Sequence, residues 1–140
     1  MKHILLILIL AGHAPAQTLW QNPTRLAPVD VTFGKTATAT GTVRVQKIHG
    51  TNGPLFPHVL LPERPIQVRL TGEDLRGNPP VPPDEPMRIV VLIPADKRIA
   101  ATLEKAEGKQ VGLTYVLNSA NPDVNIHTVN LFVKRVRIVE

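Results

Sequence analysis

The sequence predicts an all-β domain with one helix, folded as a five-stranded barrel. Three observations lead to this prediction. Fourteen prolines in 140 residues exclude a mostly helical fold, because proline breaks the interior of a helix. Five segments after residue 35 carry the alternating or continuous apolar residues that are typical of strands. One further segment, residues 97–106, has the apolar spacing of a helix.

The first sixteen residues predict a cleavable secretory signal peptide. Lys2 gives a basic start, Ile4 to Leu10 form an apolar run, and Ala14-Pro15-Ala16 is the small-x-small pattern that signal peptidase reads. The apolar run is much shorter than the roughly 20 residues that cross a bilayer, so we expect no integral membrane anchor. Cleavage would leave residues 17–140 in the periplasm or secreted.

Composition supports the same compartment. The chain has no cysteine, whereas small secreted eukaryotic domains are usually rich in disulfides. The nearest match to a glycosylation sequon, Asn22-Pro23-Thr24, is blocked by its proline. Both absences favour a protein of the bacterial envelope. The net charge of +5 is a mild bias toward anionic partners.

The first part of the exported chain divides into an arm and a strand. Residues 17–35 show little periodicity and predict an extended N-terminal arm that lies on the domain, held by Trp20. From Thr36 to Gln46, small or apolar residues alternate with polar ones, which predicts a long strand with one solvated face. Gly41 on its inner face indicates a bend or a close backbone approach. The residues expected on that inner face are Ala37, Ala39, Gly41, Val43 and Val45.

The middle of the chain predicts two more strands. Residues 56–61 and 66–70 form one extended segment that Pro62 and Pro65 interrupt, which implies a sheet edge or a bulge. A proline-rich loop follows at residues 77–86. The third strand, residues 88–93, is almost wholly apolar, as a central buried strand would be.

The predicted helix has clear signals at both ends. Asp96 is a good N-cap residue, and Gly108 is the expected C-terminal stop. Between them Ile99, Ala100, Leu103 and Ala106 form one apolar stripe, so we expect this stripe to pack against the barrel.

The last two strands follow the helix. In the fourth, residues 110–118, one face carries Val111, Leu113, Tyr115 and Leu117. The fifth strand changes parity, because Val129, Leu131 and Val133 share one face whereas Val136 and Ile138 lie on the other. One extra residue at Lys134-Arg135 would restore a continuous apolar face, which predicts a β-bulge there.

This order of elements defines the predicted architecture. Three strands, a helix and two strands in residues 36–140 favour an OB-fold-like five-stranded Greek-key barrel, with the helix between strands 3 and 4. The alternative is an antiparallel sandwich with one appended helix.

Two segments resemble a known family. Residues 58–66 (HVLLPERPI) resemble a "VL-x-L-x-x-P-I" motif, and residues 108–111 (GKQV) resemble a "GK-x-V" element, in a family of small exported bacterial domains of unknown function. The family is thought to be OB-like, so the resemblance implies that fold and an exported location. Its members carry a run of histidines in the last hairpin, where this chain has only His127 followed by Thr128.

No catalytic or metal-binding constellation stands out, so we expect neither an enzyme nor a cofactor. Ser119 lacks the surroundings of an activated nucleophile. His49, His58 and His127 are not paired at the short spacings of metal ligands. The acidic pairs in the loops, at 73–74 and 84–85, are typical of solvated turns.

The sequence therefore predicts a non-enzymatic exported binding module of the bacterial envelope, whose partner is a protein or an anionic envelope glycan. The alternative is a single-stranded nucleic-acid-binding OB-fold protein, and a hydrolase is a distant third. Arg44 and Arg69 would converge if the first two strands pair, with the 77–86 loop as one wall of a groove. The expected ligand-binding residues are Arg44, Arg69, Lys134, Arg135 and Arg137.

Overall fold

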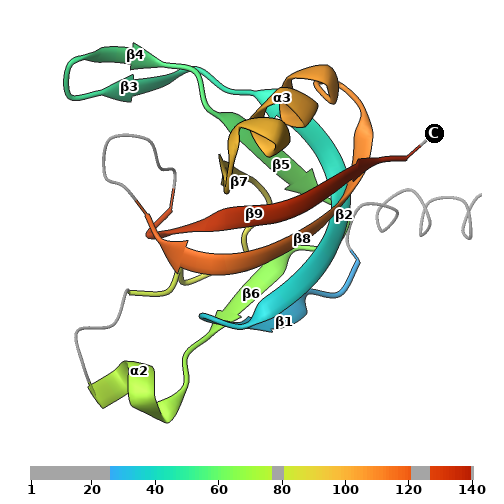
Figure 1. Ribbon diagram of the computed structural model, residues 1–140. Helices are drawn as coiled ribbons and strands as arrows, with labels where there is room; N and C mark the ends of the chain where they lie inside the picture. The colour runs from blue at the N-terminus through green and yellow to red at the C-terminus, as the bar shows by residue number, and fades with distance from the viewer. Residues whose placement is uncertain (1–25, 77–80, 121–126, 140) are drawn as a thin grey trace, which may run out of the picture.

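A closed barrel of five strands forms the centre of the molecule (Figure 1). The computed structural model describes residues 26–76, 81–120 and 127–139. The predicted signal peptide and most of the predicted arm, with Trp20, lie outside these residues. The barrel strands, in their order around the barrel, are β2 (Thr36–Val45), β5 (His58–Pro62), β7 (Val90–Pro94), β9 (Val129–Ile138) and β8 (Gln110–Ser119).

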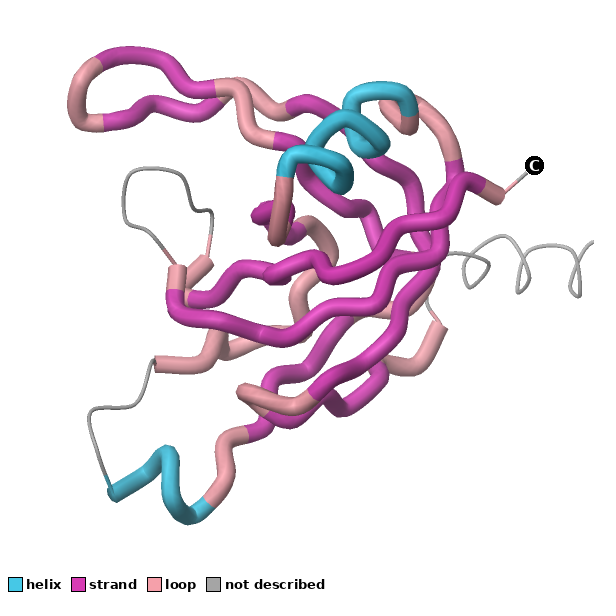
Figure 2. The backbone as a smooth tube through the Cα atoms, viewed as in Figure 1, coloured by secondary structure: helices cyan, strands magenta, loops and turns pink. Residues whose placement is uncertain are grey.

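The predicted all-β barrel with a helix is thus confirmed, and the closed sheet rules out a two-sheet sandwich. Neighbouring strands are antiparallel except β7 and β9, which are parallel. The nine-residue helix α3 (Lys97–Lys105) lies between β7 and β8 in the chain and packs against β9 and β7. Figure 2 shows the strands wrapping around one centre with this helix outside them.

The barrel interior is filled by alternate residues of each strand. On β8, Val111, Leu113, Tyr115 and Leu117 are at most 2% exposed, as the alternation predicts. The inner face of β2 is less regular. Gly41 and Val43 are buried, whereas Val45 is exposed because β2 ends there and the chain leaves the barrel.

The predicted bulge is present in β9. Thr114 of β8 pairs with Arg135, but the next residue, Tyr115, pairs with Val133, so Lys134 has no partner in the ladder. The extra residue lets Val136 pack on the core together with the residues before the bulge.

The cap and the apolar stripe of α3 are also as predicted. The Asp96 side chain accepts a hydrogen bond of 2.9 Å from the backbone N–H of Ile99. Ile99 and Leu103 are buried, and Ala106 is the C-cap. Gly108 follows with a φ of +78°, a conformation that favours glycine.

The second predicted strand divides in two, which corrects the prediction of one interrupted segment. Its later half is β6 (Ile66–Arg69), which leaves the barrel and pairs in parallel with β1 (Val29–Thr32). The prolines explain the break, because Pro62 and Pro65 have no N–H to continue the ladder. Pro65 instead uses its carbonyl, which accepts a 2.9 Å hydrogen bond from Val29.

Three short elements, in addition to β1, were not predicted. β3 (Ile48–Gly50) and β4 (Gly53–Leu55) form a hairpin that projects from the barrel, and α2 (Gly72–Arg76) is a single helical turn (Figure 1). Each has at most five residues, too few to show a period in the sequence.

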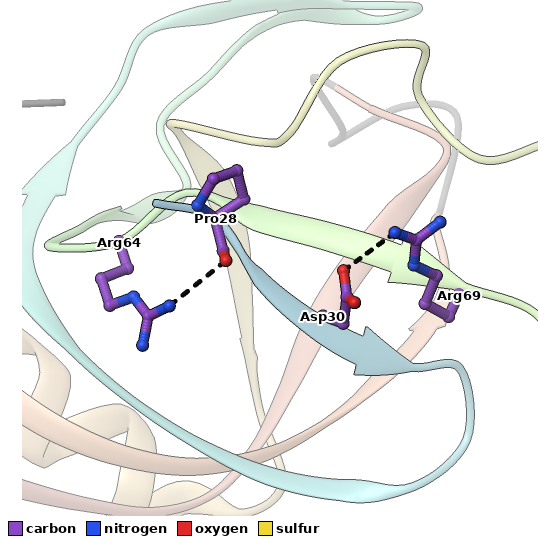
Figure 3. A network of polar contacts seen from close by, with 4 residues as sticks. All are labelled: Pro28, Asp30, Arg64 and Arg69. Carbon is purple, nitrogen blue, oxygen red and sulfur yellow. Dashed lines mark hydrogen bonds and ion pairs between the residues drawn. The ribbon is translucent and has the colours of Figure 1, made fainter. Parts of the chain in front are cut away.

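Two arginines tie β1 to the segment that contains β6 (Figure 3). Arg64 donates hydrogen bonds of 2.9 Å to the carbonyl of Ala27 and 3.2 Å to that of Pro28. Arg69 forms a 3.1 Å ion pair with Asp30. The part of the predicted arm that the structure describes therefore lies along the domain as a paired strand.

We expect truncation of Leu103 to destabilise the domain. Leu103 is fully buried under α3, so Leu103→Ala should lower the free energy of unfolding by about 2–5 kcal/mol in a urea titration. Lys105→Ala, at an exposed position of the same helix, is the control. A loss below about 0.5 kcal/mol for Leu103→Ala would contradict the packing described above.

Two glycines of the barrel should respond differently to alanine. A Cβ on Gly41 would lie 2.8 Å from the Pro62 Cα and would also meet the Leu61 carbonyl, both of them backbone. Gly41→Ala should therefore cost about 1–3 kcal/mol. A Cβ on Gly112 would meet nothing closer than 3.7 Å, so Gly112→Ala should change stability by no more than about 0.5 kcal/mol. Equal effects in thermal unfolding would refute the close approach of β2 and β5.

Candidate functional site: a basic groove

A groove of about 1060 Å³ runs across β2, β8 and β9. The first turns of α3 and the corner between β5 and β6 border it. Five cationic side chains and one acidic side chain line it. The cations are Arg64, Arg98, Lys134, Arg135 and Arg137, and the acid is Glu63.

Strand register sets the order of side chains along the groove. Thr40, Gly112 and Arg137 form one row across β2, β8 and β9, and Thr38, Thr114 and Arg135 form the row two positions along. Gly112 has no side chain, and a guanidinium nitrogen of Arg137 lies 3.7 Å from the position that its Cβ would take. The Arg137 side chain therefore lies over β8 at Gly112.

The bulge in β9 concentrates charge on this surface. In a regular strand, consecutive side chains point to opposite faces of the sheet. Lys134 and Arg135 are consecutive and both exposed, because Lys134 is the extra residue of the bulge. The irregularity that preserves the core thus also presents two adjacent cations to the groove.

Glu63 is held in place by neutral groups. Its backbone N–H donates a 2.9 Å hydrogen bond to the Thr40 carbonyl. Its carboxylate accepts a 2.9 Å hydrogen bond from the Thr40 hydroxyl and a second hydrogen bond from the Gln110 side-chain amide. These three bonds fix the carboxylate at the β2 side of the groove.

Three of the five residues expected from the sequence line the groove: Lys134, Arg135 and Arg137. Arg44 and Arg69 do not. β2 pairs with β5, where Arg44 lies opposite Val59, whereas Arg69 is on β6 outside the barrel and pairs with Asp30. Strand pairing therefore does not bring Arg44 and Arg69 together.

The expected proline-rich wall is also not found at this groove. Residues 77–80 of that loop lie outside the described part of the chain, and residues 81–86 are not among the groove's lining residues. Instead, the carbonyl of Val81 accepts a hydrogen bond from the hydroxyl of Thr128, the residue before β9.

Sequence reasoning missed Arg64, Arg98 and Glu63. Arg98 is exposed next to the buried Ile99, and the apolar stripe of α3 gives a signal for this orientation. For Glu63 and Arg64 there is no such signal, because their place depends on the turn of the chain out of the barrel after β5.

Two titratable groups with shifted pKa values, Tyr115 and His127, do not line the groove. Burial raises the pKa of the Tyr115 hydroxyl to about 12, so this core group stays protonated at neutral pH. Partial burial lowers the pKa of His127, against the opposite effect of a hydrogen bond with the backbone of Ile89. Within residues 26–76, 81–120 and 127–139, no three His, Asp or Glu side chains come together as a metal site.

Aromatic side chains do not contribute to the groove surface in the described chain: its lining includes none of Phe33, Phe56, Tyr115 and Phe132. Tyr115 is buried in the barrel, and Phe56 is 60% exposed next to the β3–β4 hairpin. Among the described residues, the groove thus offers cations, hydroxyl groups and apolar side chains, and no ring on which a base could stack.

Comparison of the chain with protein-family models, with curated proteins and with solved structures finds no match. The likeness to a family of small exported domains stays a prediction. In the residues that the structure describes, no helix has both the length and the apolar character needed to cross a membrane.

The lowered pKa of His127 predicts a pH dependence of stability. A histidine whose pKa is depressed in the folded state stabilises the fold above the unfolded pKa of about 6.5, and this contribution is lost as the pH falls. His127→Gln should therefore flatten the decrease in stability between pH 7 and pH 5. The measurement is urea unfolding at several pH values. The same slope in both proteins would show that His127 does not contribute.

Proposed function

We propose that this protein is a non-enzymatic exported binding module of the bacterial envelope, and that it binds an anionic glycan in the basic groove. The observation that carries the proposal is the set of five cations with one acid along a single groove. Such a concentration of one sign of charge raises the local concentration of an oppositely charged chain. The exported location rests on the signal pattern of residues 1–16.

The groove lining favours a glycan over a nucleic acid. Proteins that bind single strands combine a basic groove with aromatic side chains on which bases stack. Among the described residues of the groove, aromatic side chains are absent and the cations lie beside the threonines Thr38, Thr40, Thr102 and Thr114. Hydroxyls donate and accept hydrogen bonds, and this suits the hydroxyl groups of a sugar chain.

Strand order supports assignment of the barrel to the OB type. β9, the last strand, lies between β7 and β8, and α3 precedes β8 in the chain. OB-fold proteins commonly bind ligands across the second and third strands with adjoining loops. The groove proposed here lies on the first, fourth and fifth barrel strands, so it uses a different part of the barrel surface.

Removal of two groove charges tests the proposal. Arg135→Gln with Arg137→Gln should weaken binding to hyaluronan at least about tenfold, or about 1.4 kcal/mol, in isothermal titration at fixed salt. The control is Arg44→Gln with Arg69→Gln, which removes the same charge outside the groove. Thermal unfolding checks that both double variants are folded.

Two outcomes would oppose the proposal. Equal weakening by both double variants would mean that net charge, and not the groove, determines binding. Tighter binding of an oligothymidylate than of hyaluronan, with the same dependence on Arg135 and Arg137, would favour the nucleic-acid alternative.

A further inference from the structure

We propose that Glu63 makes the groove selective for anionic chains whose charges are separated by hydroxyl-bearing neutral units, and that it disfavours densely charged polyanions. This inference rests on the proposed function and names the class of glycan. Its basis is a fixed carboxylate in a groove that otherwise carries cations.

The hydrogen bonds of Glu63 hold its charge at the groove without neutralising it. Both carboxylate oxygens accept from uncharged donors, namely the Thr40 hydroxyl and the Gln110 amide. Each oxygen keeps a further lone pair that can accept a hydrogen bond. Glu63 therefore presents an oriented anionic acceptor to whatever lies in the groove.

Neither of the two cations nearest to Glu63 along the chain or along the row forms an ion pair with it. Arg64, the next residue, donates to the backbone of Ala27 and Pro28. Arg137 belongs to the same row, but Thr40 and Gly112 lie between it and Glu63. Among the described residues, the structure contains an ion pair between Arg69 and Asp30 and none with Glu63.

The distances along the row from Glu63 to Arg137 determine how close a bound anionic group lies to Glu63. Backbones of neighbouring strands are about 4.8 Å apart, so the backbones of Glu63 and Arg137 are separated by three steps, or roughly 14 Å. The two charges are closer than this, because the Arg137 guanidinium lies over Gly112 and the Glu63 carboxylate lies at the Thr40 hydroxyl. Arg135 belongs to the row two positions along, so an anionic group bound at Arg135 is farther from Glu63 than one bound at Arg137.

When one anionic group of a densely charged chain binds a cation of β9, the neighbouring anionic groups of that chain would lie beside Glu63. Two like charges about 4 Å apart in water repel by about 1 kcal/mol, which corresponds to roughly a fivefold loss of affinity. A chain with neutral sugars between its acids would bring hydroxyl groups to the same place, and these can donate to the carboxylate. A hydrogen bond to a charged acceptor is stronger than one between neutral groups.

The test compares two probes that differ in charge spacing. Hyaluronan carries one carboxylate for every two sugars, whereas linear polyphosphate carries a charge on every unit. Glu63→Gln keeps the size of the side chain and removes its charge. We expect this variant to bind polyphosphate about fivefold more tightly and hyaluronan no more tightly.

Asp30→Asn is the matched control, because it removes one negative charge at an acid that does not line the groove. It should leave the ratio of the two dissociation constants unchanged. If Glu63→Gln disturbs folding, Glu63→Asp is the second variant. Its shorter side chain draws the carboxylate back, so the ratio should shift in the same direction by less.

The outcomes separate this inference from the proposed function. An equal change for both probes in a folded Glu63→Gln protein would overturn the role of Glu63, while loss of binding in the Arg135 and Arg137 double variant would still support the groove. Insensitivity to Arg135 and Arg137 would instead overturn the proposed function.

Discussion

The pairing of β9 with two neighbours at once is the constraint on which the rest of the structure depends. Leu131 to Val133 pair with β7 on one edge and with residues 115–117 of β8 on the other, and this closes the barrel. The bulge at Lys134 follows directly after this doubly paired stretch, where β9 continues along β8 alone. It lets Val136 pack on the core, and it exposes the charge of Lys134 beside that of Arg135.

The groove follows from the same geometry. Rows of residues across β2, β8 and β9 set the distance between Glu63 and the cations of β9. Gly112 leaves space above β8 that the Arg137 side chain occupies. The site is built on paired strands and on a capped helix, so its side chains have rigid supports.

The sequence predicts features that depend on neighbouring residues, but not those that depend on contacts between residues far apart in the chain. β8, β9 and α3 have long, regular patterns, and the parity change in β9 was enough to place the bulge. The parallel pair β1–β6 could not be predicted, because it joins residues 37 positions apart, as Val29 and Ile66 show. For the same reason Arg69 was expected on the barrel, although the chain leaves it after Pro62. Lys134, Arg135 and Arg137 were found from one strand, whereas Glu63 and Arg64 join them only through the tertiary fold.

The closure of this barrel also bears on how fast the domain folds. Ser119 pairs with Val129, ten residues away, whereas Thr36 pairs with Val116, eighty residues away. The entropy lost in closing a loop grows with its length and precedes any gain from the contacts that it makes. We therefore expect the β8–β9 hairpin to form early and the pairing of β2 with β8 to limit the rate. The domain belongs with the non-local β topologies that fold in milliseconds to seconds, far more slowly than helical bundles.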